Sequence, residues 1–318
     1  MNQKLTRRRF GQLAIASTAT AAAVLAAIAN KTFAQASNLV IVGVRLGPPS
    51  TDDADTNLNS TTVDSTENST TTASTAQELV LQSLDVGTGQ VLTLTTSQVL
   101  QGGTTPILQV GEELSGLTSL ADGTIVLAIN PASTSNKGDT PTRLTFLGTS
   151  PKVVTVSELN KQEKIESFVR TNDVNRLLGL VVKKNGTPPV KLVNINVQTG
   201  AISNNNDFTL PANVRFSNLA QCPDGKLYMT AVGKQGETSL VQLDQAEKKP
   251  ITLAQLSFNG EVWNNGLQSL VCSLGGQLIA FGARRYETPN YLHTVDVGNG
   301  VMTRLTQFDV AQITIARA

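Results

Sequence analysis

The stretch LQSLVCSLGGQLIAFGARRYETPNYLHTVDVGNGVMTRLTQ, residues 267–307, shows what kind of fold the chain can take. It contains four short segments, LQSLVCS, QLIAFGA, YLHTVDV and MTRLTQ, that are apolar or alternate between apolar and polar residues. Gly275-Gly276 separates the first two segments, and Gly298-Asn299-Gly300 separates the last two. Short apolar runs bounded by glycine turns are typical of antiparallel strands. The stretch therefore predicts one four-stranded sheet.

The turns of this unit recur along the chain. The turn between its first two strands has counterparts at Asp122-Gly123, near Asn175-Arg176 and at Asp224-Gly225, about 50 residues apart. The turn between its last two strands is repeated as SLDVGTG (83–89), NINVQTG (194–200) and TVDVGNG (294–300). Four strands per repeat of about 50 residues are typical of a β-propeller. A β-sandwich would not repeat the same turns at a fixed interval. We therefore predict an all-β propeller.

Counting the repeats predicts five blades. Four complete units span residues 111–156, 166–209, 215–256 and 267–307. An incomplete first unit has strands near residues 38–46, 78–86 and 90–96 but lacks an innermost strand. Residues 311–316, AQITIA, read as a strand outside the complete units. We expect this C-terminal strand to complete the first blade and close the ring, because closure removes exposed sheet edges.

Residues 47–77 interrupt the first blade with a segment made almost entirely of Pro, Ser, Thr, Asn and Asp. Such a segment buries too little apolar surface to offset the entropy of ordering it, so we predict a disordered loop. Six blades are the alternative if this insertion contains a degenerate unit.

The repeats resemble those of secreted bacterial β-propeller proteins in which a DG turn alternates with a DxxTG turn. The residues that carry the resemblance are Asp122-Gly123 and Asp224-Gly225 for the first turn, and Asp85 with Gly89, Asn196 with Gly200 and Asp296 with Gly300 for the second. No Trp-Asp pair ends a blade, as it does in WD40 proteins, and the aromatic positions of kelch repeats are missing. The resemblance covers residues 37–318 and implies the fold, but no particular substrate.

The first 36 residues resemble a bacterial twin-arginine (Tat) signal peptide. Thr6 to Gln12 reads TRRRFGQ, residues 13–28 are an uncharged Ala-rich run, and Ala34-Gln35-Ala36 is a small-x-small cleavage site. The run is short and weakly apolar for a membrane span, which needs about 20 strongly apolar residues. We therefore expect cleavage, no membrane span afterwards, and a periplasmic or extracellular protein. An uncleaved anchor is the alternative.

Charge and composition limit the classes of partner and cofactor that we expect. The signal segment holds five of the 25 basic residues and no acidic residue, which leaves 20 basic residues against 24 acidic ones. That balance argues against a nucleic-acid partner. One histidine and two cysteines do not suffice for a zinc site built from these residues, so we expect no metal and no cofactor. We expect a monomer whose partner is a protein or a glycan.

A ligand site is expected on one face of the propeller. The turns between strands 1 and 2 and between strands 3 and 4 are short and regular, whereas the loops between strands 2 and 3 vary in length. Variable loops on a rigid scaffold carry most binding groups. The candidates near this face are Trp263, Asn264, Asn265, Arg215, Arg284, Arg285 and Tyr286. Trp263 is predicted either to stack on a sugar ring or to pack between blades. We therefore predict an exported binding or scaffold module that is not an enzyme.

The alternative is a hydrolase or lyase that acts on carbohydrate or a related small molecule. Glu113 and Glu166 begin neighbouring blades and are candidate acid and base residues.

Cys222 and Cys272 stand near the ends of adjacent inner strands, where an oxidising compartment permits a disulfide.

Overall fold

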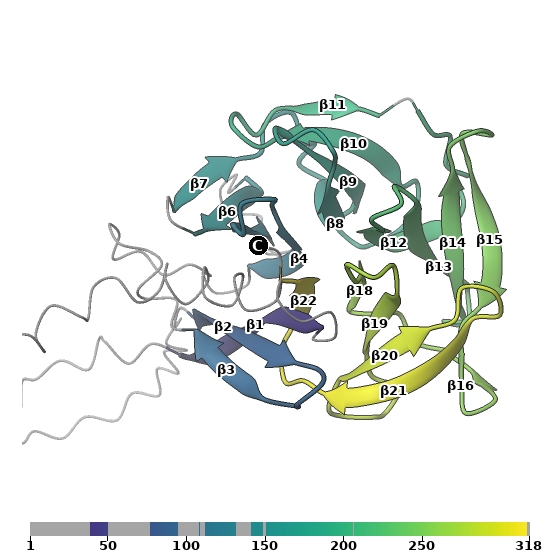
Figure 1. Ribbon diagram of the computed structural model, residues 1–318. Coiled ribbons are helices and arrows are strands. Elements are labelled where there is room, and N and C mark those ends of the chain that lie inside the picture. Colours follow the sequence, from purple (N-terminus) through teal and green to yellow (C-terminus); the bar gives the residue numbers. More distant parts are fainter. Residues whose placement is uncertain are drawn as a thin grey trace, which may run out of the picture.

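The computed structural model describes residues 39–49, 77–94, 108, 112–131, 141–148, 151–205 and 207–316. The regular structure of these residues is β-strand, arranged as five sheets around a common centre (Figure 1). The protein is thus a five-bladed β-propeller, as the repeats predict. This part of the chain contains no helix that is long and apolar enough to cross a membrane. The predicted signal peptide, residues 1–36, lies outside the described residues.

The first blade is assembled from distant parts of the chain. From the inside outwards it consists of β22 (Gln312–Ile315), β1 (Val40–Pro49), β2 (Gln77–Asp85) and β3 (Val91–Leu94). β22 pairs antiparallel with β1, with Ile315 opposite Ile41, so the C-terminal strand closes the ring as expected. After a break in register, β1 continues to Pro49, which pairs with Gln77, so pairing extends into both ends of the predicted loop. Residues 50–76 of that loop lie outside the described residues.

Each of the other four blades comes from one continuous segment. From the inside outwards, these blades are β4 (Glu113–Ser119), β5 (Ile125–Asn130), β6 (Arg143–Leu147) and β7 (Lys152–Thr155); β8 (Glu163–Arg170), β9 (Arg176–Lys183), β10 (Lys191–Asn196) and β11 (Ile202–Asn204); β12 (Arg215–Gln221), β13 (Leu227–Val232), β14 (Thr238–Asp244) and β15 (Lys249–Gln255); and β18 (Ser269–Cys272), β19 (Leu278–Gly282), β20 (Tyr291–Val295) and β21 (Val301–Gln307). A hairpin of β16 (Ser257–Phe258) and β17 (Glu261–Val262) adds to the outer edge of the fifth blade, where β16 runs parallel to β21.

Blades bury both of their faces, one against each neighbour. In β9, Leu177 and Val181 pack in the cluster between the second and third blades, whereas Leu178, Leu180 and Val182 pack between the third and fourth. Successive side chains of a strand point to opposite faces. A strand buried on both sides therefore reads as a nearly continuous apolar run, as RLLGLVVK in β9 does.

In the third and fifth blades, the repeated turn between strands 3 and 4 contacts the end of the preceding blade. The side chains of Asp85, Asn196 and Asp296 accept hydrogen bonds from backbone N–H groups of their own turns. Gly300 ends the last of these turns at a φ of 75°. Its carbonyl accepts a hydrogen bond of 3.0 Å from the N–H of Ser257, and a Cβ on it would lie 2.2 Å from the carbonyl oxygen of Gln255. Glycine at this position therefore lets the turn touch the end of the fourth blade.

A polar side chain crosses every interface between blades. Starting between the first and second blades, these side chains belong to Ser119, Asn130, Ser167, Asn218 and Ser269. Asn130 is fully buried, and its Nδ2 donates to the carbonyl of Ile165 at 2.8 Å while its Oδ1 accepts from the N–H of Ile165 at 3.2 Å. Satisfied polar contacts of this kind fix how two packed sheets dock.

Candidate functional site

A hollow of about 700 Å³ opens on the face of the propeller that carries the loops between strands 2 and 3. The described residues that line it are Glu113, Gln162, Lys164, Glu166, Lys183, Lys184, Asn185, Gly186 and Arg215. Glu113 and Arg215 are the first residues of β4 and β12, and Glu166 lies in the first half of β8. The second, third and fourth blades therefore contribute to one site, at the ends where their inner strands begin. The side chains among these described lining residues are all polar or charged.

The inner strands of these three blades share an irregularity. β4 has one between Leu114 and Gly116, β8 has one between Ile165 and Ser167, and β12 has one between Ser217 and Ala220. In β8, Ile165 lies opposite Val181 and Ser167 lies opposite Leu180, so Glu166 is the extra residue of a β-bulge. A bulge changes the direction of a side chain and is common next to functional sites. Here it presents the Glu166 carboxylate to the hollow.

Glu166 has an unusual environment for a carboxylate. Burial raises the pKa of its carboxyl group above the usual value, and the nearby charge of Glu113 acts in the same direction. Lys164 and Arg215 act in the opposite direction without outweighing burial. Glu113 instead forms an ion pair, with its Oε2 2.8 Å from Nζ of Lys164. The structure gives Glu166 neither a hydrogen bond nor an ion pair with any described residue.

Cations surround this carboxylate without pairing to it. Lys183, Lys184 and Arg215 form no ion pair within the described part of the chain. Gly186 has a φ of 71°, and a Cβ on it would lie 3.6 Å from Nη2 of Arg215. The guanidinium group therefore lies against the turn that follows β9. Once the Lys164–Glu113 pair is set aside, three cations and one carboxylate remain among the described residues of the hollow.

Trp263 takes the second of the two roles expected of it. Its side chain is 1% exposed and lies in the apolar cluster between the fourth and fifth blades. Its ring centroid is 5.3 Å from that of His293, in an edge-on arrangement. The segment between the fourth and fifth blades lies against the fifth blade, because β16 of the β16–β17 hairpin pairs with β21 just before Trp263. The indole therefore offers no face to a ligand in this structure.

The remaining predicted ligand residues lie at the fifth blade, on elements that do not line the hollow. Asn264 is exposed, whereas Asn265 uses its Nδ2 to donate to the carbonyl of Ala283 at 2.9 Å. Arg284 is ion-paired with Glu261. The Arg285 guanidinium lies 5.2 Å from the ring centroid of Tyr286, which is 93% exposed at a φ of 70°. Among the predicted site residues, the hollow brings together only Glu113, Glu166 and Arg215.

The lysines of the hollow, Lys164, Lys183 and Lys184, were not predicted as site residues. Lys164 stands two residues before Glu166 in an inner strand, and alternation in a strand puts such residues on one face. Lys184 begins the loop between strands 2 and 3 of its blade. These two signals were available in the sequence. No group of three or more His, Cys, Asp or Glu side chains in the described segments is placed to hold a metal ion.

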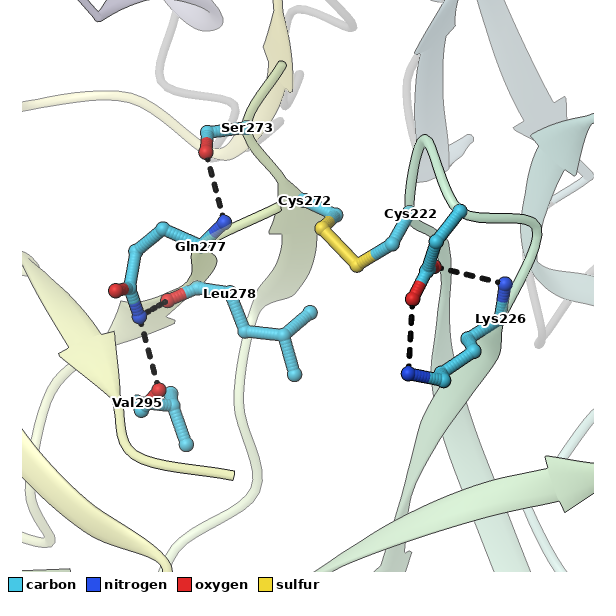
Figure 2. Close-up of a disulfide and its surroundings, with 8 residues drawn as sticks. Cys222, Lys226, Cys272, Ser273, Gln277, Leu278 and Val295 are labelled. Atoms are coloured by element: carbon cyan, nitrogen blue, oxygen red, sulfur yellow. Dashed lines mark hydrogen bonds and ion pairs between the residues drawn. A yellow bond between two sulfur atoms is a disulfide. The ribbon is translucent and has the colours of Figure 1, made fainter. Parts of the chain in front are cut away.

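On the opposite face, Cys222 and Cys272 form a disulfide with their Cα atoms 5.1 Å apart. Figure 2 shows it joining the residue after β12 to the end of β18, so it connects the inner strands of the fourth and fifth blades. The neighbouring turn is held by Gln277, whose Nε2 donates to the carbonyl of Val295 at 2.9 Å (Figure 2). Both cysteines are buried.

No protein-family model matches this sequence, and no curated protein matches it. Among solved structures, the chain is similar to TolB from Acinetobacter baumannii at 11% identity and a TM-score of 0.43, covering 76% of this chain and about half (52%) of TolB. It is similar to AofleA from Arthrobotrys oligospora at 13% identity and a TM-score of 0.44, over 77% of this chain and 71% of that one. A protein of unknown function from Bacteroides caccae matches at 9% identity and a TM-score of 0.44, over 89% and 100%. These likenesses are too distant to carry an argument about function.

Proposed function

We propose that the chain is an exported binding module and that the hollow on its loop face holds the ligand. The observation that carries this proposal is the Glu166 carboxylate, which sits half-buried on a bulge without a partner among the described residues. A polar group withdrawn from water without a hydrogen bond costs free energy, and a ligand that supplies the bond removes that cost. A hollow of about 700 Å³ is also the size of known small-ligand pockets.

Two observations support export. Residues 1–36 carry the three parts of a Tat-type signal peptide in order. The Cys222–Cys272 disulfide is a bond that persists mainly in oxidising compartments. We therefore propose that the protein works in the periplasm or outside the cell.

The test is a binding screen on the chain that begins at Ser37. Small molecules are screened by their effect on the melting temperature, and hits are measured by calorimetry. We expect Arg215→Ala to weaken binding of a hit at least about tenfold, because it removes a charge-assisted contact. Lys249→Ala is the matched control, since Lys249 pairs with Glu247 on an outer strand. If both variants lose the same affinity for a hit, or if Arg215→Ala does not change the affinity, the ligand binds elsewhere.

The second candidate is a hydrolase or lyase that uses the same hollow. A carboxyl group with a raised pKa suits a general acid, which Glu166 would be, while Glu113 would supply the second carboxylate. This function requires turnover of chromogenic glycosides that is lost in Glu166→Gln and Glu113→Gln. Binding without turnover favours the first candidate.

A further inference from the structure

The hollow carries more positive than negative charge. Lys183, Lys184 and Arg215 have no ion-pair partner among the described residues, whereas the charge of Lys164 is matched by Glu113 at 2.8 Å. Arginine forms paired, charge-assisted hydrogen bonds with carboxylate and phosphate groups. A molecule with an anionic group satisfies these cations, and a neutral molecule does not.

Glu166 adds a second requirement. Its carboxylate is directed into the same hollow and has no hydrogen-bond partner among the described residues. A molecule with only anionic groups would bring its charge close to this carboxylate and would leave the oxygens of Glu166 unsatisfied. Hydroxyl groups donate hydrogen bonds to carboxylates. A molecule that satisfies both the cations and Glu166 therefore carries an anionic group together with hydroxyl groups.

The described lining residues do not provide stacking or apolar contacts for a ligand. None of these described residues is aromatic, so this part of the lining offers no ring on which a nucleobase or another flat molecule stacks. Nor does any described lining residue offer an apolar side chain to cover a hydrophobic ligand. The described lining residues can contact a ligand through charge and hydrogen bonds.

We propose that the hollow binds a small hydroxylated anion of the sugar-acid or sugar-phosphate type, with its anionic group on Arg215 and the two lysines and its hydroxyl groups on Glu166. This inference rests on the proposed function, because it assigns a ligand class to the same site. The two types share one chemistry, and the experiment separates them.

The experiment compares four probes by calorimetry at low salt. Glucuronate and glucose 6-phosphate combine charge and hydroxyl groups, glucose has hydroxyl groups alone, and succinate has charge alone. We expect glucuronate or glucose 6-phosphate to bind at least about tenfold more tightly than either single-feature probe, and to weaken as salt rises. The tighter of the two identifies the anionic group.

Two variants assign the roles. Arg215→Met keeps an unbranched apolar stem and removes the guanidinium charge, so we expect it to weaken binding of the sugar anion about tenfold or more and to leave binding of glucose unchanged. Glu166→Ala should weaken the sugar anion and strengthen succinate, because it removes both the acceptor and the repulsion. Equal melting temperatures of the variants show that they are folded.

The outcomes separate the two proposals. If glucose or succinate binds as tightly as the sugar anions through Arg215 and Glu166, or if neither sugar anion binds, the ligand class is wrong. If the wider screen also yields no ligand that responds to Arg215→Ala, the hollow is not a binding site and the proposed function falls with it.

Discussion

His293 is the only histidine of the chain, and it is fully buried. Its ring makes edge-on contacts with Phe258, Trp263 and Tyr291, at centroid distances of 5.2, 5.3 and 6.5 Å. Arg304 lies over the Phe258 and Tyr291 rings and is ion-paired with Glu287. Burial, followed by the positive charge of Arg304, lowers the pKa of His293 to about 4.

This burial makes the stability of the protein depend on pH. The unfolded chain protonates His293 near pH 6.5, whereas the folded chain does so only near pH 4, so stability falls as pH drops from about 6.5 to 4. The total loss from this residue is about 3 kcal/mol. Urea unfolding at a series of pH values measures it. His293→Phe keeps a ring in place but does not titrate. The part of the pH dependence of the unfolding free energy that comes from His293 should therefore disappear in this variant. An unchanged slope in the variant would mean that other groups cause the dependence.

Glycine at the end of the repeated turn is a second prediction at this scale. Gly300 and Gly89 have similar φ values of 75° and 70°, but a Cβ on Gly300 would meet the Gln255 carbonyl oxygen, whereas one on Gly89 would meet nothing within 4 Å. We expect Gly89→Ala to cost about 1–2 kcal/mol from the left-handed conformation alone. Gly300→Ala should cost about 3 kcal/mol or more, because overpacking is added. Chemical denaturation of both variants measures the difference, and equal losses would contradict a close contact at Gly300.

Among the elements, the inner strands of neighbouring blades contact one another around the whole ring. β12 and β18 are fastened at one end by Cys222–Cys272 and further along by Asn218, whose Nδ2 donates to the Leu267 carbonyl at 3.0 Å. The disulfide joins cysteines 50 positions apart, and the segment between them contains β18 and the three outer strands of the fourth blade, β13, β14 and β15. The junction between the fourth and fifth blades is thus held by both a covalent bond and a buried amide.

Loss of the disulfide should therefore lower the stability of the whole chain. For a closed segment of 50 residues, the reduced unfolded chain gains entropy equivalent to about 4 kcal/mol, and measured losses are commonly about 2–5 kcal/mol. Thermal unfolding with and without a reductant checks this. The Cys222→Ala and Cys272→Ala double variant should have the melting temperature of the reduced protein, and the reductant should not change it. A reductant effect that persists in the double variant would have another cause.

The whole molecule depends on β22, which lies between β4 and β18 and fills the inner position of the first blade. Ile313 and Ile315 in this strand are buried at 1% and 4% exposure. Burying two such side chains stabilises the fold by about 3–6 kcal/mol, a large part of the roughly 5–15 kcal/mol that a domain has in total. We therefore expect the five blades to unfold as one cooperative unit only when this strand is present.

Deletion of residues 311–316 should abolish the cooperative unfolding transition seen by circular dichroism and promote association in size-exclusion chromatography, because the β1 edge is exposed. A rescue variant carries the same residues before Leu39, joined through a short turn. Ile315 lies opposite Ile41, so this arrangement is an antiparallel hairpin. Recovery of the transition in the rescued chain would attribute the defect to the missing strand. A deletion chain that unfolds cooperatively would show that the ring does not need it.

The blades and the closing strand could be predicted because each depends on local patterns: a glycine turn, an alternation, a strand such as AQITIA left over after counting. Part of the site could be predicted for the same reason, since Glu113, Glu166 and Arg215 stand at the beginnings of inner strands. Trp263 could not be assigned, because only tertiary packing decides whether a connector lies on the surface or folds inward. The bulge at Glu166 also leaves no mark in a single sequence, because it depends on the register with β9.

The late position of β22 has a consequence for how the protein is made. Every other described strand precedes it in the chain, so the ribosome completes β1, β2 and β3 roughly 200 residues before their inner partner. Throughout that interval the nascent first blade has an open edge that another nascent chain can pair with. Translation that stops early leaves this edge open permanently. We therefore expect the nascent first blade to be prone to aggregation until β22 has been made.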